Sequence, residues 1–517
     1  MLFNSPHFLF LFLPITLVGF FIVARVRGAN AAVAWLVLAS LVFYGAWNPR
    51  YVLLIALSIG INFSVGREIS ASAMARRRRA DALLALGVTL NLAALAYFKY
   101  TNFIVQTMND VLSLGWNIEH IVLPLAISFF TFQQIAYLVD ARWGISEEPD
   151  FLRYCLFVTF FPQLIAGPIV HHAEVLPQFK RSETFQPRWS NIAIGTTIFA
   201  VGLFKKVVIA DSIAVLVTPI YSAAEAGGPL HLMESLVAVG GYTLQLYFDF
   251  SGYSDMAVGL ARMFGIKLPI NFDSPYKATG VIDFWRRWHM TLSRFLRDYL
   301  YFPLGGNQHG VGRRYVNLMI VMLLGGLWHG AGWTFVFWGG LHGVYLIVNH
   351  LWRAALPRRS QAAWAILGAR SFTLFWVMVA WVFFRAESFD AAVAIFEGFL
   401  VLPSTLPDKL PAMAGSLAAF GFVFEGPYFT ETHALHLFFG CVALGFVWFL
   451  PNTQQLLEDF APALGHVKDD PRHGGRPCFT SRIKLQPSWP WGIFTGALLL
   501  ASISHLTRVT EFLYFQF

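Results

Sequence analysis

The chain has 517 residues, of which 56% are hydrophobic and only 13% are charged. A soluble domain carries about a quarter charged residues, so the composition excludes that class and indicates a membrane protein. The formal net charge is +8, but the basic residues lie in short loops between apolar runs, where they orient a chain in a membrane, and we expect no nucleic-acid partner. Bilayer-length apolar runs recur from end to end and predict an all-α, polytopic fold of roughly 11 to 13 membrane-embedded helices. One integral-membrane domain, residues 1–517, is the simplest division.

The first three apolar runs predict helices over residues 7–24, 29–46 and 51–66. The start of the chain lacks a basic segment and a small-residue cleavage site, which predicts a retained helix and not a signal peptide. Arg67 and four consecutive arginines at positions 76–79 place the loop after the third run on the cytoplasmic side. The amino terminus is then expected outside the cytoplasm.

Further runs predict helices over residues 82–98, 121–139 and 154–170. The last of these contains FPQLIAGPI, whose prolines and glycine interrupt helical hydrogen bonding, so we expect a broken or re-entrant segment there. His171 and His172 follow it. An interfacial histidine pair at a helix end is the favoured interpretation, ahead of a metal site.

Apolar runs continue over residues 190–224 and 242–265. In the second, Asp249 and Asp255 flank a Ser-Gly-Tyr sequence within an apolar context, which predicts an unwound turn. Capping of that turn is favoured over direct catalysis by these two aspartates.

The remaining apolar runs predict four more helices, over residues 371–386, 390–406, 432–450 and 490–506. The polar loop from roughly 452 to 488 carries several basic residues and is expected on the cytoplasmic side. No internal repeat of fixed period is visible, which weighs against an inverted-repeat transporter. The three widely spaced cysteines indicate neither a disulfide framework nor a zinc site, and we predict no bound metal.

The densest cationic and aromatic segment lies between Phe284 and Gly343. Over residues 284–299 the apolar positions follow a helical stripe and the arginines occupy the other face, which predicts an interfacial amphipathic helix. Its arginines suit either anionic lipid headgroups or the phosphates of a donor such as coenzyme A, and the sequence does not choose between them. The following PLGGNQHGVGRR lacks the spacing of a P-loop.

Three histidines, His289, His329 and His342, fall in this same segment. His329 stands inside an apolar run, in LWHGAGW, where glycines allow neighbouring helices to approach closely. A neutral imidazole can take a proton from a hydroxyl as its oxygen attacks a thioester carbonyl, which is general-base chemistry. A structural, hydrogen-bonded histidine is the competing interpretation. No G-x-S-x-G motif offers another nucleophile.

Several long motifs in order resemble the membrane-bound O-acyltransferase (MBOAT) family, and within it the bacterial alginate-acetylating subgroup. They cover nearly the whole chain: MLFNSPHFLFLFLP, FPQLIAGPIV, YFDFSGYSDMAVGLA, FWRRWHMTLSRFLRDYLYFPLGG, GLWHGAGWTFVFWGGLHG and EFLYFQF. The resemblance implies that His329 is the essential catalytic histidine and that His289 matches its partner position, commonly Asn, Asp or His, about forty residues upstream. It also implies a tunnel or funnel through the bundle.

The same resemblance implies acetyl-CoA as acyl-donor substrate, no tightly bound cofactor, and an exported, alginate-like polysaccharide as acceptor. A separate periplasmic SGNH-type acetyltransferase, the polysaccharide export machinery and membrane lipids are the implied partners, at the bacterial inner membrane. Besides the two histidines we predict four substrate-binding residues: Trp328, Arg297, Asp298 and Asn317.

The alternatives are a transporter or channel for an acetyl donor or saccharide, a scaffold for a secretion complex, or an acyltransferase with another acceptor, such as cellulose, peptidoglycan, teichoic acid or a secondary wall glycan. The sequence leaves open the acceptor, the partner, the oligomeric state and the choice between direct transfer and a covalent intermediate. It also assigns no role to His171 and His172, and His342 is expected to serve packing or to support the other two histidines.

Overall fold

The computed structural model of the protein describes residues 1–73, 76–145, 150–356, 362–402, 416–424, 431–464, 488–506 and 513. The described chain is largely helical, with almost no strand, which confirms the all-α prediction. Among these residues, five helical spans are long and apolar enough to cross a membrane: Phe8–Arg27, Arg50–Ser72, Arg77–Leu112, Trp189–Glu225 and Ala363–Arg385. Three shorter apolar helices, Ala29–Gly45, Phe438–Phe449 and Trp489–Ser504, accompany them. The chain is a multi-pass membrane protein.

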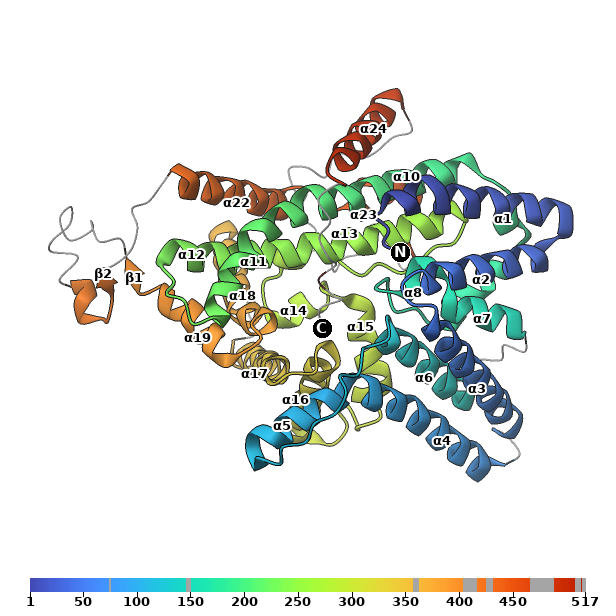
Figure 1. The fold of residues 1–517 in the computed structure, drawn as a ribbon, viewed down its shortest axis with the longest axis horizontal. Helices are drawn as coiled ribbons and strands as arrows, with labels where there is room; N and C mark the ends of the chain where they lie inside the picture. Colours follow the sequence, from blue (N-terminus) through green and yellow to red (C-terminus); the bar gives the residue numbers. More distant parts are fainter. Residues whose placement is uncertain are drawn as a thin grey trace.

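The amino-terminal third forms a group in which α3 packs against both α4 and α6. In Figure 1 these three helices lie together at the lower right. Its elements are η1 (Phe8–Phe12), α1 (Leu13–Arg27), α2 (Ala29–Gly45), α3 (Arg50–Ser72), α4 (Arg77–Leu95), η2 (Ala96–Tyr100), α5 (Thr101–Leu112), α6 (Ile127–Trp143), α7 (Phe151–Thr159) and α8 (Phe161–Leu164). The segment predicted to be broken is so, because α7 ends at Thr159 and only the short α8 precedes the non-helical chain that reaches His171. The helix predicted from residue 121 begins six residues later, at Ile127.

A long central helix, α13, organises the middle of the chain, and all 22 of its residues are buried. It crosses the centre of Figure 1 with α10 alongside. The elements of this part are α9 (His172–Val175), η3 (Leu176–Lys180), η4 (Ser182–Phe185), α10 (Trp189–Leu203), η5 (Phe204–Ala210), α11 (Asp211–Glu225), α12 (Leu232–Leu236), η6 (Val237–Gly241), α13 (Tyr242–Met263) and η7 (Pro275–Lys277).

Facing glycines bring α10 and α13 together. A Cβ atom added at Gly195 would lie 2.6 Å from the carbonyl oxygen of Gly259, and one added at Gly202 would lie 2.6 Å from that of Gly252. Small residues of this kind let membrane helices approach backbone to backbone. Gly252 is the glycine of the Ser-Gly-Tyr sequence. The predicted unwound turn there is wrong, because α13 runs through it unbroken and the glycine serves close packing.

The two aspartates beside that sequence pair with lysines of η5 instead of capping a turn. Lys206 Nζ lies 2.6 Å from Asp249 Oδ1 and 2.6 Å from Asp211 Oδ1, and all three side chains are buried. Lys205 Nζ lies 2.7 Å from Asp255 Oδ2, which also accepts a hydrogen bond from Thr453. These ion pairs compensate charges that would otherwise be costly inside the bundle.

The carboxy-terminal half consists of α14 (Val281–Trp285), α15 (Met290–Leu296), η8 (Arg297–Tyr301), α16 (Gly310–His329), α17 (Trp333–Ala355), α18 (Ala363–Arg385), α19 (Phe389–Gly398), α22 (Glu431–Phe449), α23 (Thr453–Leu456), η9 (Glu458–Phe460) and α24 (Trp489–Ser504). Two short strands, β1 (Val401–Leu402) and β2 (Val423–Phe424), pair in parallel. The helix predicted over residues 390–406 ends at Gly398 and is followed by β1. A proline at position 403 opposes a helix through the end of the predicted range, because the residue before a proline disfavours helical backbone. The loop predicted over 452–488 lies largely outside the described residues, which resume at residue 488.

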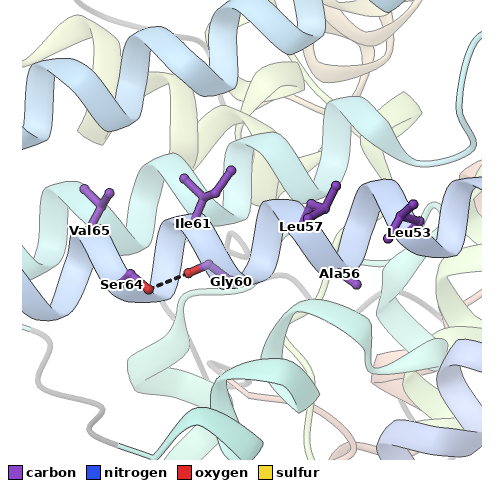
Figure 2. A pocket seen from close by; sticks show the side chains of 7 residues that line it. All are labelled: Leu53, Ala56, Leu57, Gly60, Ile61, Ser64 and Val65. Carbon is purple, nitrogen blue, oxygen red and sulfur yellow. Dashed lines mark hydrogen bonds between the residues drawn. The ribbon is translucent and has the colours of Figure 1, made fainter.

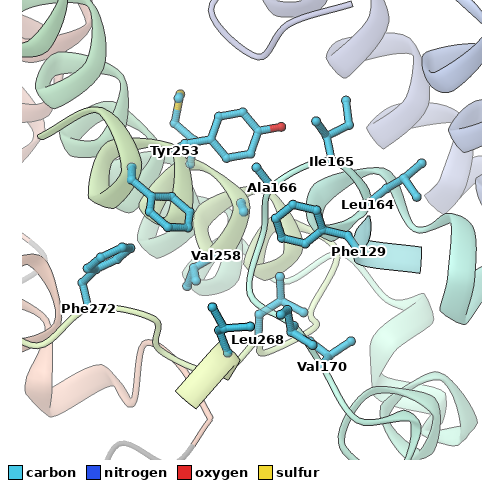
Figure 3. Packing of buried hydrophobic residues seen from close by; sticks show 14 of the residues in the cluster. Phe129, Leu164, Ile165, Ala166, Val170, Tyr253, Val258, Leu268 and Phe272 are labelled. Carbon is cyan, nitrogen blue, oxygen red and sulfur yellow. The ribbon is translucent and has the colours of Figure 1, made fainter. Parts of the chain in front are cut away.

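One extensive hydrophobic cluster joins these groups. Figure 3 shows a part of this cluster that includes Phe129 of α6, Leu164 of α8, and Tyr253 and Val258 of α13. The amino terminus joins the same core, since the Phe3 ring stacks on Tyr253 at a centroid distance of 4.8 Å. Segments far apart in the sequence therefore hold α13 from several sides.

The outer face of α3 lies mostly outside this hydrophobic cluster. It carries an open, apolar hollow of about 600 Å³ whose only hydroxyl, that of Ser64, donates to the carbonyl of Gly60 (Figure 2). The lining residues are Leu53, Ala56, Leu57, Gly60, Ile61, Ser64 and Val65. On a membrane-spanning helix such a face suits lipid chains, and it offers no groups for acyl-transfer chemistry.

Candidate active site

His329 is the last residue of α16 and is buried, with 4% of its surface exposed. The chain leaves the helix at Gly330, where a Cβ atom would lie 2.2 Å from the Phe335 ring, so glycine is required for the turn into α17. The imidazole lies among aromatic rings, with centroid distances of 5.1 Å to Trp338 and 5.3 Å to Phe384. This environment excludes bulk water from the ring.

The α16–α17 hairpin that carries His329 is held by another glycine pair. A Cβ atom at Gly326 would lie 2.3 Å from the Phe335 carbonyl oxygen, and one at Gly339 would lie 2.3 Å from the carbonyl oxygen of Met322. This confirms the expectation that glycines around His329 permit close helix contact.

His289 occupies the junction between α14 and α15 and is fully buried. Its backbone is left-handed, with φ 42° and ψ 53°, a conformation that non-glycine residues adopt rarely. The single amphipathic helix predicted over residues 284–299 is therefore wrong as one element, because the chain is helical only to Trp285 and again from Met290. The apolar stripe is nevertheless buried, at Phe284, Trp288, Leu292, Phe295 and Leu296.

Asn271 orients the His289 ring. Its Oδ1 accepts hydrogen bonds from the backbone N–H of Thr291 at 3.3 Å and from the Thr291 hydroxyl at 2.9 Å, and lies 3.1 Å from His289 Nδ1. The backbone N–H of Thr291 can only donate, so the Asn271 atom that it contacts must be the acceptor oxygen, Oδ1. The His289 Nδ1 atom that faces this oxygen must therefore carry the proton when the ring is neutral. The other nitrogen, Nε2, is then the acceptor.

The rings of His289 and His329 lie 6.2 Å apart, centroid to centroid. His342 lies in the same aromatic group, 4.9 Å from Trp338, and its Nδ1 accepts a hydrogen bond from Trp285 Nε1 at 3.2 Å. The structure therefore brings all three histidines of the central segment into one buried region. His342 has the opposite tautomer to His289, with its proton on Nε2 when neutral.

Trp328, predicted to bind substrate, lies beside both catalytic candidates. Its ring centroid is 5.0 Å from that of His329 and 6.2 Å from that of His289. Phe132 stacks on it at 5.1 Å. Within the described residues, the indole nitrogens of Trp328 and Trp338 are buried and have no hydrogen-bond partner, so two rings that pack against His329 each carry an uncommitted N–H donor.

The other predicted substrate residues lie elsewhere and are engaged. Arg297 and Asp298 form a two-point ion pair with each other, at 2.7 and 3.1 Å, and this hydrogen-bonded carboxylate raises the pKa of the Arg297 guanidinium. Asn317 is buried and donates to the carbonyls of Leu304 and Gly306, which fixes the loop before α16. Their substrate roles stay predictions.

His171 and His172 belong to a separate polar group. His172 Nδ1 lies 3.4 Å from Asp140 Oδ2, and Tyr299 donates its hydroxyl to Asp140 Oδ1 at 2.8 Å while lying 2.9 Å from His171 Nδ1. Nearby, Arg294 pairs with Glu174 at 2.5 and 2.9 Å. No metal-ligating group of three or more side chains is found among the described residues.

Two residues that the sequence did not single out support the site. Asn271 holds His289, and Lys99 of η2 donates to the carbonyls of Trp328 and His329. A lone lysine within an apolar run is itself a signal, because ionisable residues at membrane depth mark functional sites by default. Asn271 lies in a loop of ordinary composition and gave no such signal.

Comparison with known proteins identifies the class. The family model for MBOAT, the membrane-bound O-acyltransferase family, matches residues 141–386, which include both His289 and His329. The chain belongs to this family and is an O-acyltransferase.

Individual similar proteins include acyltransferases of bacterial glycans and teichoic acid. The chain is 44% identical to "Peptidoglycan O-acetyltransferase" of Helicobacter pylori, over 78% of this chain and 80% of that protein. It is 40% identical to "Probable alginate O-acetylase AlgI" of Azotobacter vinelandii, over 81% of this chain and 82% of the relative. A "Teichoic acid D-alanyltransferase" of Streptococcus thermophilus is 27% identical over 53% of this chain and 68% of its own length.

Proposed function

We propose that this acyltransferase moves acetyl groups from acetyl-CoA towards hydroxyl groups of an exported, alginate-like polysaccharide, with His329 as general base or acyl relay. The observation that carries the proposal is the buried meeting of the His329 and His289 rings beside Trp328, at centroid distances of 5.0 to 6.2 Å. His289, held by Asn271, positions the reacting groups.

The chemistry requires one proton to move twice. The neutral His329 imidazole takes the proton of an acceptor hydroxyl while its oxygen forms a bond to the thioester carbonyl carbon. When the carbon–sulfur bond breaks, the imidazolium returns that proton to the leaving thiolate, which departs as the free thiol. The indole N–H groups of Trp328 and Trp338 are suited to donate to the acyl oxygen as it gains negative charge.

The donor is taken from the cytoplasm and the acetyl group leaves on the other side of the bacterial inner membrane, through a tunnel that reaches His329. A periplasmic SGNH-type acetyltransferase and the export machinery complete the transfer. The names of two relatives support a glycan as the final acceptor, since they describe O-acetylation of peptidoglycan and of alginate.

Peptidoglycan is a second candidate acceptor. The relative from Helicobacter pylori bears that name and is 44% identical, against 40% for the alginate-type relative from Azotobacter vinelandii. The difference is small, so the acceptor has to be decided by measurement.

The deciding experiment compares a deletion strain complemented with the wild-type chain, with His329→Ala, or with His120→Ala. His120 is exposed in the loop before α6 and serves as the matched control. We expect His329→Ala to lower ester-linked acetate on the glycan at least about 100-fold, at equal membrane abundance, because general-base catalysis contributes that much. His120→Ala should retain wild-type acetylation.

Ester acetate is measured separately in exopolysaccharide and in peptidoglycan, which identifies the acceptor. Purified protein with labelled acetyl-CoA then separates enzyme from transporter, because only an enzyme releases free thiol in a His329-dependent manner. Retained acetylation by a folded His329→Ala variant would contradict the proposed role of this histidine.

A further inference from the structure

The carboxyl end of α16 is closed by side chains from a distant element. The last four carbonyls of a helix have no partner within it, and at membrane depth no water satisfies them. In α16 these belong to residues 326–329, and the Gly330 N–H bonds only the first of them, at 3.3 Å. The carbonyls of Leu327, Trp328 and His329 need other donors.

Two consecutive residues of η2, more than 220 positions away in the sequence, supply those donors. Tyr100 donates its hydroxyl to the Leu327 carbonyl at 3.0 Å. Lys99 Nζ donates to the carbonyl of Trp328 at 2.5 Å and to that of His329 at 3.1 Å. All three carbonyls are thereby satisfied.

The Lys99 ammonium is also fully used. An ammonium group has three donors, and the third acceptor is the Ser128 hydroxyl of α6, at 3.5 Å. Lys99 is buried, with 7% of its surface exposed, and its Nζ lies 5.9 Å from the centroid of the Trp328 ring. All three acceptors are neutral, so the cation is balanced by carbonyl dipoles at the negative end of α16.

The next helix holds the other side of the same turn. Phe103 and Thr107 of α5, which directly follows η2, contact Trp333 at the start of α17, through a ring-centroid distance of 5.5 Å and a 3.3 Å hydrogen bond. The η2–α5 unit therefore contacts the chain on both sides of the turn at residues 330–332. It contacts the end of α16, which carries His329, and the start of α17.

We propose that Lys99, assisted by Tyr100, is a positioning residue for the reaction: its ammonium fixes the last turn of α16 and thereby the place of the His329 ring relative to His289 and the acyl donor. This inference rests on the proposed catalytic role of His329. Positioning errors near 1 Å can cost about 100-fold in rate, so the cap is expected to act on turnover more than on binding.

The test uses full-length Lys99→Met, Lys99→Arg and Tyr100→Phe variants, with Lys267→Met as the matched control. Lys267 lies in the loop after α13, where its backbone carbonyl and N–H pair with the Gln178 side chain. Steady-state release of thiol from acetyl-CoA gives kcat and KM. Hydrogen–deuterium exchange of peptides spanning residues 325–335 reports on the cap without requiring turnover.

We expect Lys99→Met to lower kcat by about 10- to 100-fold with KM within about twofold, and to speed exchange in the spanning peptides. Lys99→Arg restores the cation and should recover most of kcat, which a residue needed only for packing would not produce. Tyr100→Phe removes the hydroxyl that donates to the carbonyl of Leu327, two residues before His329, and should lower kcat about threefold. Lys267→Met should change neither measurement.

A folded Lys99→Met protein with wild-type kcat and wild-type exchange overturns the proposal. If Lys99→Met does not accumulate, Tyr100→Phe decides the matter, and an unchanged kcat together with unchanged exchange overturns it. Should the wild-type chain itself release no thiol from acetyl-CoA, the proposed function has failed, while the exchange measurement still judges the cap.

Discussion

Lys206 and Lys99 are both buried lysines at helix junctions, yet their charges are balanced in different ways. Lys206 lies between two carboxylates, Asp211 and Asp249, at 2.6 Å from each. Lys99 binds two backbone carbonyls and a hydroxyl. The first arrangement joins three elements through full charges and serves stability. The second places a cation on the end of the helix that carries His329, where, under the proposed function, small displacements would alter the rate of acyl transfer.

The largest expected loss of stability is that of removing the Lys206 ammonium. Lys206→Met leaves Asp211 and Asp249 buried without their cation, and breaking such a buried pair costs about 3 to 5 kcal/mol. Lys99→Met leaves only neutral acceptors and should cost less, about 1 to 3 kcal/mol. Thermal unfolding midpoints of both purified variants in one detergent measure the difference. Equal losses of stability would erase the contrast between the two lysines.

The glycine contact next to Lys206 should be the next most sensitive. Gly202→Ala puts a Cβ atom 2.6 Å from the Gly252 carbonyl oxygen, and such overpacking costs about 1 to 3 kcal/mol. Gly240→Ala in η6 is the control, because nothing lies within 4 Å of its added Cβ, and it should be neutral or stabilising by about 0.5 to 1 kcal/mol. The unfolding midpoint should therefore fall for Gly202→Ala and stay unchanged or rise for Gly240→Ala. Equal shifts would mean that the α10–α13 contact is not tightly packed.

On the His329 side, Asn271→Ala should act on turnover. It removes the acceptor that fixes the His289 ring, and the loss of one hydrogen bond of about 1.4 kcal/mol corresponds to about a tenfold lower kcat. Thr291→Val, which removes the hydroxyl partner of the same oxygen, should have a smaller effect. Labelled acetyl-CoA assays of both variants provide the comparison. A larger effect of Thr291→Val would show that Asn271 is not the main support of His289.

The smallest expected effect on stability is that of breaking the exposed Arg297–Asp298 ion pair. Arg297→Gln breaks the exposed pair with Asp298, and exposed pairs contribute about 0 to 1 kcal/mol, so the unfolding midpoint should barely move. If Arg297 binds donor phosphates as the sequence predicts, KM for acetyl-CoA should nevertheless rise, and more at low ionic strength. An unchanged KM would remove Arg297 from the predicted substrate residues.

Much of the bundle was predictable because its helices are set by apolar length. The break after Thr159 followed from the prolines and glycine of FPQLIAGPI. The meeting of His289 with His329 was implied by the family resemblance and was not readable from spacing, since it depends on how α14, α15 and α16 pack. The fold and the site therefore rest on different kinds of signal.

The failures have local causes. The sequence around Gly252 predicted a break, whereas the glycine admits the backbone of α10 and the flanking aspartates find lysines on η5. The helical stripe over residues 284–299 hid the left-handed residue at its centre, because burial of the stripe does not require one continuous helix. Lys99 could not be assigned to His329 from sequence, because the two residues lie 230 positions apart. Asn271 could not be assigned to His289, because their contact depends on how the chain after α13 folds back.

The left-handed backbone of His289 limits what evolution can place there. Asparagine, aspartate and histidine are enriched several-fold among the few non-glycine residues that adopt positive φ, whereas β-branched side chains are strained. These are the three residue types that the family resemblance implies for this position. The left-handed backbone therefore limits this position to a few side chains, and the three that the resemblance implies are among them.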